Sequence, residues 1–256
     1  MNTDKKSKLN LLLSTIPAGV VLTSAWLSEQ GYSAELQKQY RKSQWFRSIG
    51  TGALIREGDQ VDYLGGIYAL QSQLGMTIHP GAKTALSLQG RAHYLDFNEQ
   101  RAMLFGSQRE KLPKWYDSYH WGVNIECKSS GFLPPDLGLV ELDHKSFNVK
   151  VSSPARALLE CLYLAPDHQP LLEVYELMEG LNNLRPVTVQ SLLENCTSVK
   201  VKRLFLYMAE KAGHDWFNFL KIEKIDLGSG KRVIVPGGSF NARYQITIPR
   251  ELESAS

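Results

Sequence analysis

Two short helical segments joined by a glycine, within residues 23–42, constrain the fold more than any other part of the chain. Thr23 is a residue type that caps helix starts, and helix-forming residues follow it over 24–30. Gly31 supplies the small residue that ends this helix, and Ser33 supplies the cap of the next one. Two capped helices joined by a short glycine-containing turn form a helix-turn-helix. The sequence therefore predicts this motif near its amino terminus.

The second of these helices has an apolar side and a polar side. Leu36 and Tyr40 lie four residues apart, so they share the face that is expected to pack on the core. The residues expected to face outward are Gln37, Lys38, Gln39, Arg41 and Lys42. Long amide and cationic side chains bind the edges of bases and the phosphates of nucleic acids. We therefore expect this helix to contact DNA.

Two short strands are predicted directly after the helix-turn-helix. They cover residues 45–49 and 53–56, with the glycine-rich turn 50–52 between them. The run 20–22 is β-prone and could join these strands. An amphipathic first helix, stopped by a proline, is predicted from the spacing of Leu9, Leu12, Leu13 and Ile16. Together these elements predict a winged helix-turn-helix.

The positive charge of the chain is concentrated in the same region. The whole chain carries a formal net charge of +3. Residues 1–48 contain seven Lys and Arg residues against three Asp and Glu residues, which gives +4 for this segment and −1 for the rest. A basic segment that coincides with a helix-turn-helix is typical of a protein that binds a polyanion. For Lys38, Arg41 and Lys42 we favour phosphate contact over a merely solvated face.

The rest of the chain is predicted to form a larger α+β domain. A turn at 57–59 places the first domain at residues 1–60, with a boundary that could extend to about residue 90, and the second at residues 61–256. The elements predicted in the second domain are a helix over 82–89, a hairpin of 93–97 with 102–105, strands and loops over 111–139, four helices with one-sided apolar stripes between 154 and 208, a hairpin of 224–227 with 232–235, and a strand within 243–248. The fold class is therefore expected to be α+β.

Composition excludes several classes of protein. Hydrophobic residues make up 43% of the 256 residues, enough for a substantial core, and no apolar run approaches the roughly 20 residues of a membrane span. The lysine-rich amino terminus lacks the apolar core of a signal peptide, so we expect a cytoplasmic protein. Cys127, Cys161 and Cys196 are widely spaced, and the six histidines lack the spacing of metal ligands. We expect no disulfide, metal or cofactor.

Two further groups of polar residues leave alternatives open. Glu126 and Lys128 have the Glu-x-Lys spacing of some metal-dependent nucleases, with Asp117 upstream as a further carboxylate. Because patterns of three residues often arise by chance, we favour a surface ion pair over catalysis. Near the start of the fourth of the predicted helices, three cations could either bind phosphate or form a solvated face. They are Lys200, Lys202 and Arg203.

Several stretches, taken in order, resemble one known family. They begin with LNLLLSTIPAGVVLTSAWLSEQGYSAELQKQYRKSQWFRSIGTGALIREGD and IYALQSQLGMTIHPGAKTALSLQGRAHYL, and continue with SSPARALLECL, LRPVTVQSLLENC and VKRLFLYMAEKAGHDW. Their order and spacing are similar to those of the AbiEi-type antitoxins of type IV toxin–antitoxin systems. The resemblance implies an N-terminal winged helix-turn-helix that binds inverted repeats in the promoter of its own operon and represses it. It also implies a C-terminal antitoxin domain that opposes a nucleotidyltransferase toxin encoded beside it, without stable direct contact.

The leading hypothesis is a sequence-specific repressor that binds double-stranded DNA as a monomer or as a dimer assembled on the DNA. Base readout is assigned to Gln37 or Lys38, because residues early in an inserted helix generally reach base edges. The residues predicted to lie at the DNA are Ser33, Ala34, Glu35, Gln37, Lys38, Arg41, Lys42, Arg47, Thr51 and Arg56. The alternatives are a metal-dependent nuclease with a DNA-binding head and a protein-interaction module.

Overall fold

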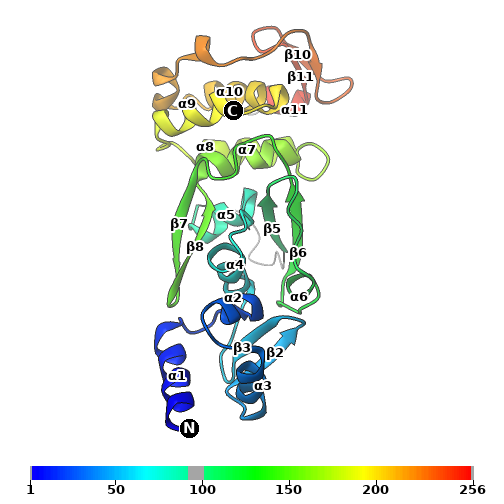
Figure 1. Cartoon of the computed structure of the whole chain (residues 1–256). Coiled ribbons are helices and arrows are strands. Elements are labelled where there is room, and N and C mark those ends of the chain that lie inside the picture. Colours follow the sequence, from blue (N-terminus) through cyan, green and yellow to red (C-terminus); the bar gives the residue numbers. More distant parts are fainter. Residues whose placement is uncertain (1, 92–100, 255–256) are drawn as a thin grey trace.

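The protein is elongated, with three layers stacked along one axis (Figure 1). The structure is a computed structural model that describes residues 2–91 and 101–254, with side chains from residue 8 onward. The amino terminus lies in a head at one end, two sheets and their helices form the middle layer, and the carboxyl terminus lies in a helical layer at the other end. Helices and strands are mixed along the chain, so the predicted α+β fold class is confirmed.

The head has the element order of a winged helix-turn-helix. Its elements are α1 (Asn2–Thr15), β1 (Val21–Thr23), α2 (Ser24–Glu29), α3 (Ala34–Lys42), β2 (Phe46–Gly50) and β3 (Ala53–Arg56). The Thr23 side chain caps α2 by accepting a hydrogen bond from the Trp26 amide at 3.4 Å. Ser33 caps α3 in the same way through the Leu36 amide, also at 3.4 Å. Gly31 lies between the helices with φ +84°, a conformation that is strained for any residue with a Cβ atom.

The three strands of the head form one antiparallel sheet in the order β1-β3-β2. Leu22 of β1 lies opposite Leu54 of β3, and Arg47 of β2 lies opposite Ile55. The β-prone run at 20–22 therefore does contribute a strand to the wing, shifted by one residue. β2 and β3 form the wing itself, and its tip lies between residues 50 and 53.

The middle layer contains a three-stranded sheet and a separate hairpin. Its elements are α4 (Tyr63–Ser72), β4 (His79–Pro80), α5 (Ala82–Leu88), β5 (Arg101–Gly106), α6 (Lys114–Asp117), β6 (Asn124–Ser129), β7 (Leu139–His144) and β8 (Phe147–Ser152). β5 pairs with β4 in antiparallel and with β6 in parallel orientation, and β7 pairs with β8. The predicted hairpin of 93–97 with 102–105 has its first half outside the described residues, and its second half lies in β5.

Close backbone packing joins the head to α4. A Cβ atom on Gly65 would lie 2.1 Å from the carbonyl oxygen of Gly19, so only glycine fits at this position. Just after α4, the Gln73 side chain accepts a hydrogen bond from the Thr23 amide and donates one to the Val21 carbonyl, both at 2.8 Å. The side-chain amide of Gln73 thus replaces the missing strand partner along the free edge of β1.

The C-terminal layer is built around a buried helix. The four helices predicted between 154 and 208 are confirmed as α7 (Pro154–Leu164), α8 (Leu171–Glu179), α9 (Pro186–Asn195) and α10 (Val199–Lys211). Leu158, Leu159 and Leu162 of α7 are fully buried, and α7 packs against α5, α8, α9 and α10. The layer is completed by β9 (Arg232–Val233), β10 (Ser239–Asn241), β11 (Ile246–Ile248) and α11 (Arg250–Ser254).

The hairpin predicted for 224–227 with 232–235 is wrong. Residues 222–224 form a short 3-10 helix, and β9 pairs in parallel with β11 instead. The physical reason is Arg203, whose guanidinium binds the carbonyl oxygens of Leu227 and Gly230 and so takes acceptors that a strand would need. No helix in the described part of the chain is long and apolar enough to cross a membrane.

Candidate nucleic-acid interface

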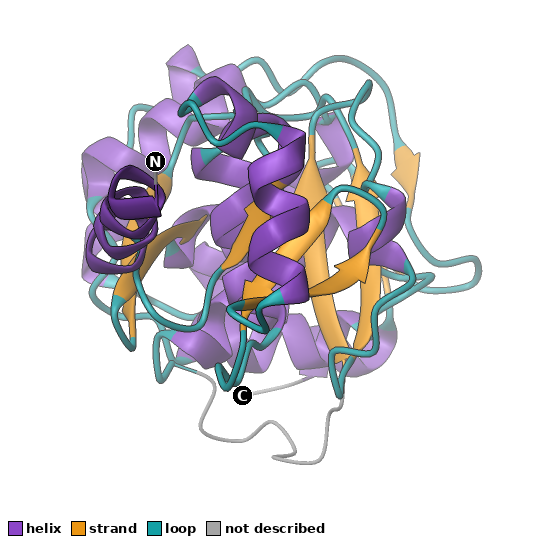
Figure 2. Cartoon of the chain, turned by 60° about the horizontal axis from the view of Figure 1, so that its bottom comes forward, coloured by secondary structure: helices purple, strands orange, loops and turns teal. Residues whose placement is uncertain are grey.

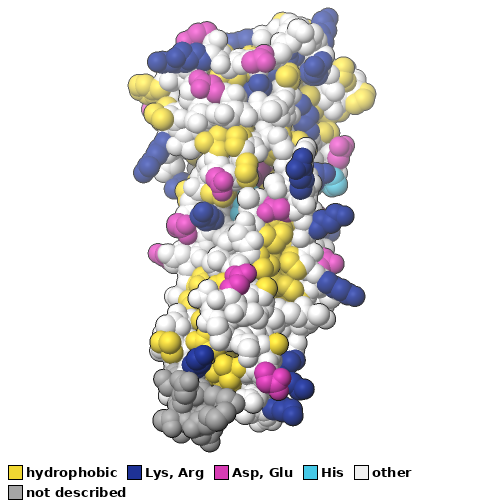
Figure 3. Space-filling model, viewed as in Figure 1, with side chains coloured by type: hydrophobic (Ala, Val, Ile, Leu, Met, Phe, Trp, Pro, Cys, Tyr) yellow, Lys and Arg dark blue, Asp and Glu magenta, His cyan; other side chains and the backbone are white. Residues whose placement is uncertain are grey.

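The side of α3 that points away from the core is cationic and open to solvent. Leu36 and Tyr40 are buried, as their spacing predicts. The exposed residues of α3 that were assigned to the interface are Ala34, Glu35, Lys38, Arg41 and Lys42. Lys and Arg side chains gather at the end of the molecule where α3 lies, beside an acidic one (Figure 3). Figure 2 brings this end forward and shows a helix lying in front of the strands. We call Lys38, Arg41 and Lys42 the cationic ridge.

Gln37 does not belong to this exposed surface, so its assignment to base readout is corrected. Its side chain is only 5% exposed. Its Nε2 atom donates to the carbonyl oxygen of Tyr32 at 2.8 Å and to Ser24 O and Ser28 Oγ at 3.2 Å. These groups lie in α2 and in the turn, so Gln37 fastens the two helices together. The sequence carried this signal, because Leu36, Gln37 and Tyr40 form one continuous helical stripe.

The cap and the wing place further predicted residues at the surface. Ser33 is exposed and uses its hydroxyl to start α3, which is the supporting role predicted for it. Arg47 on β2 and Thr51 at the wing tip are also exposed. Trp45, between α3 and β2, was assigned only to a strand, yet 47% of its surface is open to solvent. An exposed indole next to the cationic ridge is a residue that periodicity alone does not single out.

Arg56 lies elsewhere, and its assignment to the wing-side contacts is wrong. Its Nη2 atom donates to the carbonyl oxygens of Leu13 at 3.1 Å and Ile16 at 3.2 Å. The last carbonyls of a helix lack intrahelical partners and carry partial negative charge, which attracts a cation. Arg56 therefore holds the end of α1 against β3 and is half-buried there.

Neither of the two alternatives left open for the cations of α10, a phosphate-binding patch or a solvated face, fits the structure. Lys202 and Arg203 are 4% and 3% exposed. Arg203 donates to four backbone carbonyls, including Leu227 O at 2.8 Å and Gln245 O at 3.1 Å. Lys200 donates to the carbonyls of Tyr163 at 3.1 Å and Ala165 at 2.6 Å, and burial lowers its pKa. Lys200 and Arg203 bind the protein's own backbone and Lys202 is buried, so the three cations do not form a surface for phosphate.

The residues of the nuclease alternative lie in the middle layer, with Glu126 and the half-buried Lys128 both on β6. Glu126 on β6 lies 3.5 Å from Arg101 on the neighbouring strand β5. Asp117 is exposed at the end of α6. Within the residues that the structure describes, no group of three His, Cys, Asp or Glu side chains is placed to hold a metal ion. A surface ion pair, the favoured interpretation, is therefore present, but Glu126 makes it with Arg101 of β5 and not with Lys128 of the Glu-x-Lys pattern.

Two family models match the chain, one after the other. The model described as the AbiEi antitoxin N-terminal domain of a transcriptional regulator covers residues 5–97. The model described as a transcriptional regulator, AbiEi antitoxin, type IV toxin–antitoxin system, covers residues 99–249. The chain belongs to the AbiEi antitoxin family. The expected resemblance is therefore confirmed over almost the whole chain.

The structure of this AbiEi protein is similar to a solved one. The crystal structure of the RV2827C protein from Mycobacterium tuberculosis superposes with a TM-score of 0.58 at 14% sequence identity. The match covers 89% of this chain and 85% of the other. At this identity the likeness concerns the fold alone. A comparison with curated proteins finds no match.

Proposed function

We propose that this AbiEi protein represses its own operon by inserting α3 into the major groove of promoter DNA. The observation that carries the proposal is the cationic ridge, whose three side chains are all exposed at the free end of an elongated molecule. The family is one of transcriptional regulators, which supports a role at DNA. The exposed wing residues Arg47 and Thr51 would lie over the adjacent sugar-phosphate backbone.

Lys38 is the residue to which we assign base readout. It lies one turn into α3, and the residues that share its exposed side include Glu35 and Lys42. Residues near the start of an inserted helix reach base edges. A lysine can donate to O6 and N7 of guanine, and a glutamate can accept from N4 of cytosine. The pair Glu35 and Lys38 would therefore favour G·C base pairs at the centre of each half-site.

Arg41, Lys42 and Arg47 are assigned to phosphates. They follow Lys38 along α3 and into β2, and all three are exposed. Phosphate contacts fix the register of a protein on the duplex and supply much of its affinity, but they do not read sequence. Binding should accordingly weaken steeply with added salt.

We further propose that two copies, each a monomer in solution, bind inverted repeats and assemble as a dimer on the DNA. Two-fold symmetric sites are the usual target of paired helix-turn-helix proteins. The middle and C-terminal layers would carry the antitoxin activity against a nucleotidyltransferase toxin, without stable direct contact. Membership of a type IV toxin–antitoxin family supports this part of the proposal.

Footprinting on the DNA upstream of the gene tests the proposal. Protection of an inverted repeat is expected, and Lys38→Ala should relax the base preference at one position of each half-site while leaving the protein folded. The matched control is Lys224→Ala, which removes an exposed lysine near the opposite end of the molecule. No protected site on the upstream DNA at low salt, or equal effects of both variants, would overturn the assignment of α3.

A further inference from the structure

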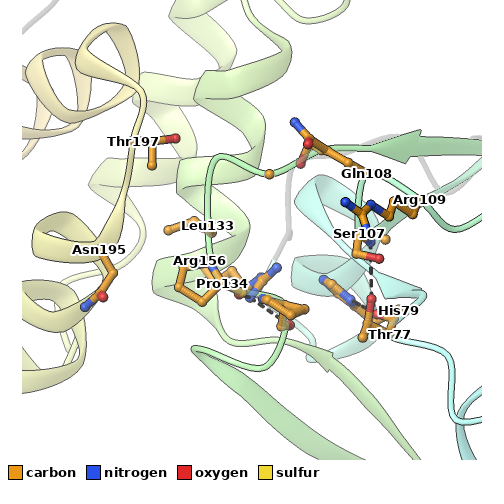
Figure 4. Close-up of a pocket in the computed structure, with 14 residues that line it drawn as sticks. Thr77, His79, Ser107, Gln108, Arg109, Leu133, Pro134, Arg156, Asn195 and Thr197 are labelled. Carbon is orange, nitrogen blue, oxygen red and sulfur yellow. Dashed lines mark hydrogen bonds between the residues drawn. The ribbon is translucent and has the colours of Figure 1, made fainter.

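A cavity of about 400 Å³ lies between the middle layer and the C-terminal helices, far along the chain from α3 (Figure 4). The loops that follow β5 and β6 form part of its wall, together with β4, α7 and the connection between α9 and α10. Small-molecule sites in proteins are typically concave spaces of roughly 300–1,000 Å³ that combine apolar walls with a few polar groups. The chemistry of the walls therefore decides whether this space can be a site.

Arg156 of α7 is the buried charged group in the cavity wall, and it is only 4% exposed. Its Nε atom donates to Glu160 at 2.8 Å, and its Nη1 atom donates to the carbonyls of Pro134 at 2.8 Å and Leu137 at 2.5 Å. Its Nη2 atom has no hydrogen-bond partner among the described residues and is not sealed by protein. Figure 4 shows the side chain reaching from α7 toward Pro134 and the space bounded by the lining residues.

The lining of the cavity carries no negative charge to match this donor. None of its fourteen lining residues is acidic, and Arg109 adds a second, exposed cation at the rim. The nearby Glu110 carboxylate does not line the cavity, and it accepts hydrogen bonds from the Thr77 and Ser107 amides and the Thr77 hydroxyl. Glu160 neutralises Arg156 from the side away from the cavity, and its carboxylate oxygens already accept several hydrogen bonds. It accepts hydrogen bonds from Ser152 Oγ at 2.7 Å and the Ala82 amide at 2.9 Å besides its contacts with Arg156 and His79. A buried guanidinium nitrogen that no protein group accepts from, and that opens on a cavity, is a site for an oxyanion.

The opposite character of the two walls restricts the size and polarity of the occupant. Leu133 and Pro134 provide an apolar surface, and Thr77 and Ser107 provide a polar one across from it, with their hydroxyl groups already bound to the Glu110 carboxylate. A bare inorganic anion would leave the apolar wall uncovered. We propose that the cavity binds a small organic oxyanion, a carboxylate or a phosphate ester, whose charged end meets Arg156 Nη2 and Arg109 and whose apolar part packs on Leu133 and Pro134.

Titration of the isotope-labelled full chain, followed by amide chemical shifts, tests this site. Phenyl phosphate and phenylacetate are the two probes, because they share an apolar ring and differ only in the oxyanion. Saturable shifts at Gly106, Ser107 and Gly131 are expected with one or both, and the tighter probe identifies the class of anion. Inorganic phosphate should bind at least about tenfold more weakly than phenyl phosphate, because it cannot cover the apolar wall.

Two variants and a control separate this site from adventitious binding. Arg109→Ala and Arg156→Lys should each weaken the binding of the tighter probe about tenfold, since each removes a charge-assisted hydrogen bond. Lys111→Ala removes an exposed cation two residues from Arg109 that does not line the cavity, and it should bind the probe unchanged. Because Arg109 is exposed, its variant remains informative even if Arg156→Lys is poorly folded. The site is refuted by an absence of saturable shifts, or by binding that survives in Arg109→Ala.

Discussion

Replacing Arg41 and Lys42 with alanine should remove most of the salt dependence of DNA binding. Three exposed cations are assigned to phosphates, namely Arg41, Lys42 and Arg47. Each neutralised phosphate contributes about −0.9 to the slope of the logarithm of the binding constant against the logarithm of salt concentration. Three contacts therefore give a slope of about −2.7 for each copy bound, and the one that remains in the double variant gives about −0.9. Between 50 and 200 mM salt, affinity should fall roughly 40-fold for the unmodified protein and roughly 3.5-fold for the variant.

Fluorescence anisotropy with a labelled duplex that carries one half-site measures both slopes directly. Circular dichroism establishes that the variant is folded. No loss of secondary structure is expected, because neither side chain is buried. The control is the double variant Lys224→Ala with Arg250→Ala, which removes the same total charge from exposed positions in the C-terminal layer. A slope that stays near −2.7 in the α3 variant, or that falls equally in the control, would refute the assignment of these residues to phosphate contacts.

Four further perturbations follow from the packing. Gln37→Ala should lower the free energy of unfolding in urea by about 2 kcal/mol, because it leaves the Tyr32 carbonyl unpaired in a buried position, and it should leave base preference unchanged. Arg203→Met should destabilise the protein by about 3 kcal/mol for the same reason, without altering the salt slope of DNA binding. Gly65→Ala should cost about 1–3 kcal/mol in thermal unfolding, because its Cβ would overlap a backbone oxygen. Burial alone would raise the pKa of Glu160, but hydrogen bonds from His79 and Arg156 hold it below the ordinary value. Its carboxylate therefore contributes stability at neutral pH that is lost as the pH falls through the lowered pKa, and Glu160→Gln should flatten this acid limb of the stability curve.

Local signals in the sequence were sufficient wherever the structure is determined by local chemistry. The caps at Thr23 and Ser33, the glycine between them and the apolar stripes of the four C-terminal helices all act within a few residues, and each predicted element is present. The exposed cations of α3 follow from the same periodicity. A helix face can be assigned from sequence when both its sides are clearly marked.

The errors share a different physical cause, which is a polar side chain that binds backbone groups of its own chain, within 5 to 13 residues for Gln37 and much farther along the chain for Arg56 and Arg203. Gln37, Arg56 and Arg203 have the residue types of a DNA-binding surface, yet each is committed to carbonyl oxygens of its own chain. The partners of Arg56 lie 40 and 43 residues away, and those of Arg203 lie 24 to 42 residues away. Composition and spacing cannot distinguish a cation that awaits phosphate from one that closes a loop. The cavity beside Arg156 cannot be found from the sequence for the same reason, since its walls come from five separate segments.

The glycine contact between residues 19 and 65 has a consequence for how two copies could cooperate. Because the backbones touch there and Gln73 ties the edge of β1, the reading head cannot swivel freely against the remainder of the molecule. The distal end of each bound copy would then point in a direction dictated by the DNA. Half-sites separated by whole turns of about 10.5 base pairs would bring the two distal ends to the same side of the duplex, and an added half turn would carry them to opposite sides.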